Sequence, residues 1–227
     1  MYVFAHYLKK SIKEGKPIWP SIRLLPITIY YNMGKKFLID WELPWIAIGA
    51  VNEIKKNLHA EMRIFEYGSG GSTLFFAKRV KKVVSVEHHP AWYSIVKKKL
   101  EDKNISKVSL ELVEPSKGLN ENSNHYKSYV EEEEYADFDF YNYVHAIDQY
   151  KCEYFDLILI DGRARPKCLQ VSISKLKNGG MLVFDNADRK NYKEAIKRNL
   201  HDWKVNKHYG PTVADPAFTE THIYYKP

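Results

Sequence analysis

A chain of 227 residues, 44% of them hydrophobic and 14% aromatic, is long enough for one sizeable α/β domain with appendages and too short for two independent enzymes. Its formal net charge of +7 is unevenly distributed, since residues 1–60 carry +5 and residues 114–150 carry −7. A basic surface broken by an acidic segment does not make a continuous phosphate-tracking groove, so a nucleic acid is not the expected partner.

The sequence shows no sign of export or of a membrane span. Residues 1–16 lack an apolar region followed by small residues, so no signal peptide is expected. The most apolar early stretch, residues 41–51, contains Glu42 and is shorter than the roughly 20 residues that a span requires. Cys152 and Cys168 have neither the number nor the spacing of a disulfide framework or a metal site. Two reduced thiols in a cytoplasmic protein are expected.

Residues 1–60 are predicted to form a helical or irregular appendage. Pro17, Pro20 and Pro26 punctuate a stretch that is expected to be irregular. From Pro44 to Leu58 the apolar residues have the spacing of an amphipathic helix. The appendage is expected to contact the substrate or a second copy of the chain.

From Met62 onward, short apolar runs alternate with amphipathic helical segments. The predicted strands are residues 63–67, 82–87, 108–113, 155–161 and 180–185, and the predicted helices are residues 72–80, 90–101, 166–176 and 191–199. This alternation predicts right-handed βαβ crossovers and a mainly parallel sheet. Residues 203–208 and 219–225 have strand composition with no helix between them, so they are predicted to form an antiparallel hairpin at the sheet edge.

Residues 114–150 separate two predicted strands by far more than a usual connection. They contain four consecutive glutamates, residues 131–134, and many aromatic side chains. Long insertions in compact domains are often lids or binding loops, so this segment is a candidate lid. An acidic, solvated excursion with a helix near residues 140–150 is an equal alternative.

A glycine-rich turn, Glu66-Tyr67-Gly68-Ser69-Gly70-Gly71-Ser72-Thr73, joins the first predicted strand to the first helix. Such a turn presents backbone N–H groups and a helix N-terminus to an anionic or polar ligand. Glu87 ends the next predicted strand, where a carboxylate can accept hydrogen bonds from ribose hydroxyls. A dinucleotide site would favour a third glycine at the position of Thr73. The carboxylate of Glu66 would repel a pyrophosphate but suits a cofactor with an α-ammonium group.

Four segments in order resemble the motifs of class I S-adenosylmethionine-dependent methyltransferases. Residues 65–73 are similar to the first motif, residues 84–90 to the second, and residues 155–161 and 179–185 to the later two. The resemblance implies a Rossmann-like, doubly wound, mainly parallel seven-stranded sheet with a C-terminal antiparallel hairpin. It also implies that residues 61–227 form the methyltransferase domain and that the cofactor is S-adenosyl-L-methionine. The implied cofactor-binding residues are Glu66, Tyr67, Gly68, Ser69, Gly70, Ser72, Thr73, Glu87, His88 and Asp161.

Methyl transfer is an in-line displacement, so the protein mainly positions the acceptor and helps to remove a hydroxyl proton. Ligands of such folds lie beyond the carboxyl ends of the strands, which places Asp161 and Asp185-Asn186 near the reaction. This pattern resembles the magnesium site of the catechol, caffeoyl-CoA and sugar O-methyltransferases. The resemblance implies that Asp161, Asp185 and Asn186 bind Mg²⁺ or another divalent cation. The catechol enzymes place a lysine base three residues after the first aspartate, and here that position is Ala164.

Asp161, Arg163 and Asp185 are the predicted catalytic residues. Arg163 or Arg165 is expected to contact a carboxylate or phosphate of the acceptor, or the carboxylate of the cofactor. In the alternative, Asp161 contacts only the cofactor, while Asp185 and Asn186 cap the following turn. Further candidates for the base lie in the 114–150 segment, namely His125, Tyr126 and His145.

These features predict an enzyme that O-methylates a small hydroxylated acceptor such as a sugar, a glycan unit or a secondary metabolite. The net charge of +7 motivates an alternative, an RNA or protein methyltransferase. No basic stretch interleaved with aromatic residues, of the kind that binds single-stranded RNA, supports that alternative. A third hypothesis is a non-catalytic cofactor-binding subunit that contacts its partner through the aromatic residues 19–45.

Overall fold

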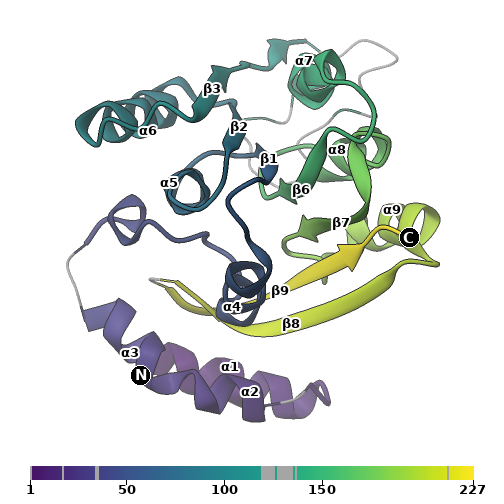
Figure 1. Cartoon of the computed structure of the whole chain (residues 1–227). Helices are drawn as coiled ribbons and strands as arrows, with labels where there is room; N and C mark the ends of the chain where they lie inside the picture. Colours follow the sequence, from purple (N-terminus) through teal and green to yellow (C-terminus); the bar gives the residue numbers. More distant parts are fainter. Residues whose placement is uncertain are drawn as a thin grey trace.

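The computed structural model describes residues 2–16, 18–33, 36–118, 126, 135, 137–213 and 215–227, and its central feature is a seven-stranded sheet (Figure 1). The strands of this sheet are β1 (Arg63–Tyr67), β2 (Lys82–Glu87), β3 (Val108–Leu112), β6 (Phe155–Ile160), β7 (Leu176–Phe184), β8 (Lys204–Thr212) and β9 (Asp215–Tyr225). Their order is β3-β2-β1-β6-β7-β9-β8. The first five run parallel, whereas β9 is antiparallel to β7 and β8 is antiparallel to β9. The predicted doubly wound sheet with a C-terminal antiparallel hairpin is confirmed.

Helices cover both faces of the sheet, which explains why its inner strands are apolar throughout. One face carries α4 (Ile48–Asn57), α5 (Gly71–Ala77) and α6 (Pro90–Asp102), and the other carries α7 (Tyr141–His145), α8 (Arg165–Ser172) and α9 (Lys190–Leu200) (Figure 1). Consecutive strand residues point to opposite faces. Ile64 therefore packs in the buried cluster with α4 and α5, while Phe65 packs in the cluster with α7, α8 and α9.

Strands β1 and β2 have the predicted bounds, β3 and β6 end one residue earlier than predicted, and β7, β8 and β9 are longer than predicted. β7 begins at Leu176, four residues early, because Leu176 pairs with Phe155 across a register irregularity. β8 and β9 pair with each other almost to their shared tip, ending with Thr212 opposite Asp215. Because β9 runs antiparallel to β7, this tip lies at the edge of the sheet where β7 ends.

The proline-rich stretch near the N-terminus is helical, and the prediction of irregular structure there is wrong. It contains α2 (Trp19–Arg23) and α3 (Leu25–Met33), which follow α1 (Tyr2–Lys13). Pro20 and Pro26 fall in the first turns of α2 and α3, where the missing N–H costs no helical hydrogen bond. Pro17 lies outside the described residues.

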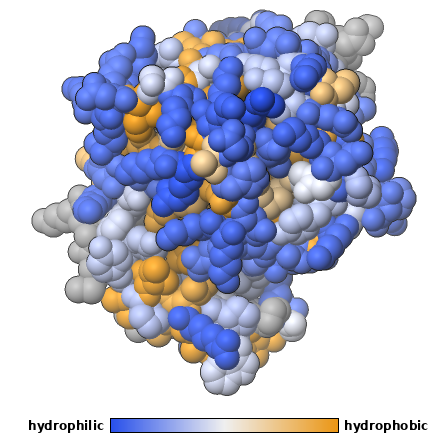
Figure 2. Space-filling view, viewed as in Figure 1, coloured by the Kyte–Doolittle hydropathy of each residue, from blue (hydrophilic) through white to orange (hydrophobic). Residues whose placement is uncertain are grey.

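The three N-terminal helices lie against the β8–β9 hairpin (Figure 1). The rings of Phe4 and Tyr7 contact the ring of Phe218, with centroids 5.2 and 5.4 Å away. Trp19, Tyr30 and Phe37 are 71%, 63% and 81% exposed, and apolar surface is visible among these helices in the lower part of Figure 2. Self-association through this segment stays a prediction. Among the described residues, no helix is both long and apolar enough to cross a membrane.

Helix α4 begins at Ile48 rather than at Pro44, because the preceding residues are tied to the hairpin. Ala47 forms an isolated antiparallel bridge with Thr212, and its N–H donates to Thr221 Oγ1 at 3.1 Å. Ile46 is completely buried in the same cluster as Ile64 of β1. The end of the N-terminal segment is thus packed into the core of the sheet.

The predicted helix near residues 140–150 is present as α7 and the 3₁₀ helix η4 (Ala146–Gln149). A short antiparallel pair, β4 (Ser116–Lys117) with β5 (Phe138–Asp139), joins the two ends of the 114–150 excursion. Residues 119–125, 127–134 and 136 of the candidate lid lie outside the described residues.

Candidate functional site

A cavity of about 910 Å³ lies at the carboxyl ends of β1, β2, β6 and β7. Strand β1 is the point where the strand order reverses, since β2 lies on one side of it and β6 on the other. Ligands of doubly wound sheets bind at this switch point. The cavity volume is within the range of small-molecule sites, roughly 300–1,000 Å³.

The loops that follow β1 and β6 touch at two glycines, which brings Asp161 beside the glycine-rich turn. Gly68 has φ +90°, a conformation that favours glycine, and a Cβ there would lie 3.0 Å from Gly162 Cα. A Cβ on Gly162 would overlap the hydroxyl of Tyr143. A backbone hydrogen bond also joins the two loops, since the N–H of Asp161 donates to Tyr67 O at 3.1 Å.

The glycine-rich turn leads directly into α5, whose first turn is closed by a side chain. The N–H of Gly70 donates to Thr73 Oγ1 at 2.9 Å, so the position where a dinucleotide site would have a glycine acts here as a helix cap. The indole N–H of Trp92 donates to Ser69 O at 2.7 Å, and this ring forms part of the cavity wall. Turn and wall therefore hold each other in place.

Glu87 ends β2 with its carboxylate fully used as a hydrogen-bond acceptor. Oε2 accepts from the N–H and the hydroxyl of Ser69 at 3.0 and 2.8 Å. Oε1 accepts from the N–H groups of His88 and His89, both at 2.9 Å. Burial alone would raise the pKa of Glu87, but the contacts from His88, His89 and Ser69 outweigh it and hold that pKa below its usual value. The side chain is therefore an ionised acceptor in the cavity wall.

Glu66 is a second carboxyl of the cofactor motif, but it lies behind the cavity rather than in its wall. The side chain is completely buried, and neither oxygen has a hydrogen-bond partner in the described part of the chain. Burial, opposed by the neighbouring hydroxyl groups of Thr73, Ser72 and Ser85, raises the pKa of Glu66 to about 7.

Seven of the ten predicted cofactor-binding residues line the cavity, namely Gly68, Ser69, Gly70, Ser72, Glu87, His88 and Asp161. The other three, Glu66, Tyr67 and Thr73, are buried behind it. The hydroxyl of Tyr67 donates to Val144 O at 2.7 Å, so it links β1 to α7 rather than facing a ligand.

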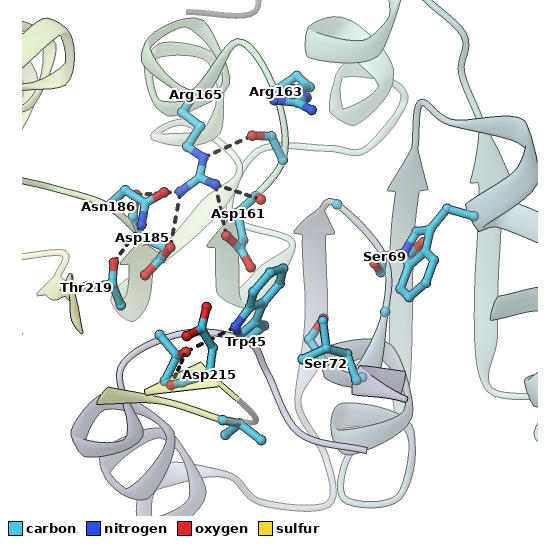
Figure 3. Close-up of a pocket in the computed structure, with 18 of the residues that line it drawn as sticks. Trp45, Ser69, Ser72, Asp161, Arg163, Arg165, Asp185, Asn186, Asp215 and Thr219 are labelled. Carbon is cyan, nitrogen blue, oxygen red and sulfur yellow. Dashed lines mark hydrogen bonds and ion pairs between the residues drawn. The ribbon is translucent and has the colours of Figure 1, made fainter. Parts of the chain in front are cut away.

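Arg165 lies between the two aspartates that end β6 and β7 (Figure 3). Its Nη2 donates to Asp161 Oδ1 at 3.0 Å and its Nη1 lies 3.4 Å from Asp185 Oδ2. The same guanidinium donates to three backbone carbonyls, those of Asp161, Gly162 and Asp185, at 2.6–2.9 Å. These five interactions match the five N–H donors of a guanidinium. Arg165 is also only 7% exposed, so it is a structural cation of the site.

One guanidinium does not compensate two buried carboxylates completely. Burial raises the pKa of Asp161 well above its usual value; repulsion from Asp185 adds to the rise, and Arg165 only partly opposes it. The Asp161 side chain still has 22% of its surface exposed and lines the cavity. Asp185 is held more tightly, since its Oδ1 accepts a 2.6 Å hydrogen bond from the Thr221 hydroxyl.

The residues predicted to bind magnesium do not fit a divalent cation. The position between Asp161 and Asp185 is taken by N–H donors and by the positive charge of Arg165, and a metal needs free oxygen lone pairs there. Asn186 Nδ2 donates to Thr219 Oγ1 at 2.6 Å, and its backbone has φ +54°. Among the described residues, no group of three or more His, Cys, Asp or Glu could hold a metal ion. The metal prediction is therefore unsupported.

Arg163 lies on the loop that leads into Arg165 but apart from Asp185 (Figure 3). Its Nε is 3.4 Å from His88 Nε2, and its guanidinium stacks over the ring of Tyr135 at 5.3 Å. Arg163 thus lines the part of the cavity next to Glu87. Its predicted catalytic role stays a prediction.

Tyr126 and His145, two of the alternative bases in the 114–150 segment, do not line the cavity. The hydroxyl of Tyr126 lies 3.2 Å from His145 Nε2, and His145 Nδ1 lies 2.6 Å from Asp148 Oδ2. Tyr126 thus contacts His145 of α7, which contacts Asp148 of η4, and none of the three lines the cavity. His125 lies outside the described residues.

Several cavity residues carry no recognisable sequence motif. For Trp92 the sequence offered only a weak indication, namely that it follows Pro90 in the first turn of α6. For Trp45 and Asp215 it offered none, since they reach the cavity only through the pairing of the N-terminal segment with the hairpin tip. Only the tertiary structure identifies them.

Comparison with known proteins agrees with this fold. No family model and no curated protein matches the chain. Among solved structures, a proposed methyltransferase from Streptococcus mutans, SMU.1697c, in complex with S-adenosylhomocysteine, is similar with TM-score 0.54 and 14% identity over 79% of this chain and 97% of that chain. A proposed rRNA methylase from Clostridium thermocellum has TM-score 0.53 and 14% identity, over 80% and 97% of the two chains.

A third similar structure is a SAM-dependent O-methyltransferase (TM0748) from Thermotoga maritima. It has TM-score 0.51 and 12% identity over 79% of this chain and 64% of that chain. At these identities the likeness shows that the chain has the fold of these methyltransferases. The acceptors that the names imply differ, so the fold does not define the acceptor.

Proposed function

We propose that the protein is an S-adenosylmethionine-dependent methyltransferase that methylates a hydroxyl group of a small acceptor. The observation that carries this proposal is the meeting, in one cavity, of the glycine-rich turn, the Glu87 carboxylate and the perturbed carboxyl of Asp161. The first two suit a nucleoside cofactor, and the third suits proton removal from an acceptor.

The chemistry of the cavity wall fits the cofactor. The Ser69 hydroxyl already donates to Glu87 Oε2 at 2.8 Å, so this carboxylate is placed to accept a hydrogen bond from a hydroxyl group. A ribose hydroxyl makes the same kind of hydrogen bond, and the ionised state of Glu87 strengthens it. On binding, the Ser69 hydroxyl would yield to the ribose, while its N–H would remain bonded to the carboxylate.

When bound, the cofactor supplies a methyl group on a sulfonium sulfur, and the sulfur keeps the electron pair of the C–S bond as the acceptor oxygen forms its new bond to carbon. Asp161 accepts the proton that the acceptor hydroxyl loses. Its raised pKa makes it a stronger base than an ordinary aspartate, as general-base catalysis requires. Arg165 holds the carboxylates of Asp161 and Asp185 in position. Neither the methyl transfer nor the proton transfer in this proposal uses a metal.

Calorimetry with S-adenosylhomocysteine tests the cofactor half of this proposal. The wild type is expected to bind, and Glu87→Ala is expected to weaken binding at least about tenfold, or about 1.4 kcal/mol. Glu61→Ala is the matched control, because Glu61 is an exposed glutamate whose one ion pair in the described part of the chain is with Lys81. Absence of binding to the wild type, or equal binding by the wild type and Glu87→Ala, would contradict the proposal.

The location of the protein stays a prediction. Cys152 is exposed and Cys168 is buried, and both are free thiols. A reducing, cytoplasmic compartment is consistent with them, and we propose that location on this ground.

A further inference from the structure

The half of the cavity away from Glu87 has a lining of its own, which we name the acceptor half. It is formed by Trp45 from the N-terminal segment, Asn186 and Asp188 from the loop after β7, and Thr212, Asp215 and Thr219 from the hairpin. Figure 3 shows Trp45 and Asp215 across the cavity from Arg165 and Asp185. Asp161 lies between this half and the glycine-rich turn, so a group bound here would be next to the proposed base.

Trp45 gives the acceptor half one large, fixed, flat surface. Its indole N–H donates to Thr212 Oγ1 at 3.1 Å, and the Thr212 hydroxyl in turn donates to Asp215 O at 3.1 Å. The buried Ile46 and the Ala47–Thr212 bridge anchor the backbone beside it. Despite this anchoring, 49% of the Trp45 side chain stays exposed. A rigid ring left open in a cavity is a surface for an apolar ligand face.

The polar groups around Trp45 mostly accept hydrogen bonds. Asp215 Oδ1 accepts from the N–H of Ala217 at 2.8 Å, and Oδ2 has no partner among the described residues. Asn186 uses its amide N–H to donate to Thr219, which leaves its Oδ1 as an acceptor. The carboxylate of Asp188 has Lys16 Nζ as a neighbour at 3.9 Å. A ligand that fits must supply several O–H donors from different sides.

The charge of this half disfavours an anionic ligand. Asp188 and Asp215 belong to this half, and Asp161 and Asp185 border it. The cations near these four carboxylates are Arg165, Arg189 and Lys16, and Arg165 is fully engaged with Asp161 and Asp185. The excess of carboxylates repels a phosphate or a carboxylate at short range. A phosphodiester chain such as RNA is disfavoured for the same reason.

We propose that the acceptor is an uncharged saccharide, which stacks one face of a sugar ring on Trp45 and donates hydroxyl hydrogen bonds to Asp215, Asn186 and Asp188. A sugar ring combines a C–H face with several hydroxyl groups around its edge, which is the combination that this lining requires. A planar phenol would use the ring but would supply too few hydroxyl donors for three separate acceptor groups. This inference rests on the proposed methyltransferase function.

An acceptor screen tests the inference. The probes are methyl glycosides of glucose, galactose, mannose and N-acetylglucosamine with their disaccharides, against uronic acids, sugar phosphates and catechols. The readout is S-adenosylhomocysteine release by the full-length protein. At least one uncharged saccharide is expected to be methylated in preference to every anionic and phenolic probe. Preference for a phenol or an anion, or no transfer to any saccharide by a protein that binds S-adenosylhomocysteine, overturns the inference.

Variants of Trp45 give the inference a second test. Trp45→Ala is expected to raise KM for the saccharide at least about tenfold, and Trp45→Phe by less than about threefold, because a phenyl ring keeps the stacking surface. Trp19→Ala is the matched control, since Trp19 is an exposed tryptophan of α2 outside the cavity. An unchanged KM in Trp45→Ala overturns the inference.

Calorimetry separates this failure from failure of the proposed function. All three variants are expected to bind S-adenosylhomocysteine within about threefold of the wild type. Loss of binding by the wild type would remove the methyltransferase function itself. Normal binding together with an acceptor of another class would remove only the saccharide inference.

Discussion

The two halves of the cavity are built in different ways. The half around Glu87 consists of backbone turns and their neighbours within two consecutive βα units, and most of its hydrogen bonds involve main-chain N–H groups. The acceptor half consists of side chains from three segments that are far apart in the sequence. The first half depends on local conformation, whereas the second depends on how the N-terminal segment and the hairpin pack together.

Asp161 and Arg165 lie where the two halves meet. The loop after β6 touches the glycine-rich turn through Gly162, and Arg165 reaches from that loop to Asp185 at the end of β7. Asp185 is in turn bonded to Thr221 of the hairpin, whose hydroxyl accepts from the N–H of Ala47. A continuous set of contacts therefore joins the locally built half to the half built by tertiary packing.

Removal of Arg165 is expected to have the largest effect, because it breaks this junction. Arg165→Met leaves Asp161 and Asp185 buried without a counter-charge, which is expected to cost about 3–5 kcal/mol of unfolding free energy. Chemical denaturation measures the loss. The double variant Arg165→Met/Asp161→Asn removes one of the two charges, so it is expected to recover part of that stability.

Metal chelation tests whether Arg165, rather than a metal ion, supplies the positive charge between Asp161 and Asp185. Because Arg165 supplies the positive charge, EDTA is expected to leave wild-type methyl transfer and stability unchanged. Mn²⁺ is expected to stabilise Arg165→Met more than the wild type, since the variant leaves carboxylate oxygens free for a cation. An Arg165→Met variant as stable as the wild type, or a wild type inactivated by EDTA, would contradict the assigned role of Arg165.

The structure of the junction explains what the sequence could and could not predict. The bounds of β1 and β2, the turn between β1 and α5, and the strand-end carboxylates followed from periodicity and from the glycine spacing, which are local signals. The partner of Asp161 and Asp185 did not follow. An Asp…Asp-Asn pattern is compatible with a metal or with an arginine, and only the geometry shows that Arg165 points between the two carboxylates.

The acceptor half was beyond sequence reasoning for a related reason. Trp45 lies in a segment that was predicted to be helical from Pro44, but the bridge between Ala47 and Thr212 precedes the helix, which begins at Ile48. Tertiary pairing therefore overrides a local helical pattern at this point. Asp215 likewise reaches the cavity only because β8 and β9 are longer than their apolar cores suggest.

Glu66 provides a smaller test, confined to the locally built half. Its pKa of about 7 in the folded protein exceeds the ordinary value of 4.5, so the folded state binds more protons than the unfolded state between these values. Stability is therefore expected to fall as pH rises from about 5 to about 7, by up to about 3 kcal/mol. Glu66→Gln cannot titrate, so it should lose the Glu66 share of this fall and keep the share that comes from Asp161, whose pKa is also raised. Denaturation curves at pH 5 and pH 8 measure the difference.

The control for this pH test is Glu61→Gln, which changes an exposed glutamate that precedes the same strand. It should keep the pH dependence of the wild type. A wild type whose stability stays constant between pH 5 and pH 8, or a Glu66→Gln variant that keeps the full dependence, would show that Glu66 does not titrate in this window.

The smallest expected effect comes from filling the contact between the two loops. Gly162→Ala places a Cβ against the hydroxyl of Tyr143 and within 3.0 Å of Gly68 N. Overpacking of this kind costs about 1–3 kcal/mol. The loop after β1 should shift as a result, so S-adenosylhomocysteine affinity should fall together with stability, as calorimetry and thermal melts can measure.

Tyr143→Phe shows whether the contact or the glycine backbone is responsible. The buried Tyr143 hydroxyl has no hydrogen-bond partner in the described part of the chain, so its removal alone should cost little. In the double variant Gly162→Ala/Tyr143→Phe the closest contact of the new methyl group is gone while its contact with Gly68 N remains, so stability and cofactor affinity should partly recover. Equal losses in the single and double variants would show that Gly162 is required by its approach to Gly68 and not by Tyr143. The locally built half would then be closed by backbone contacts alone, without help from α7.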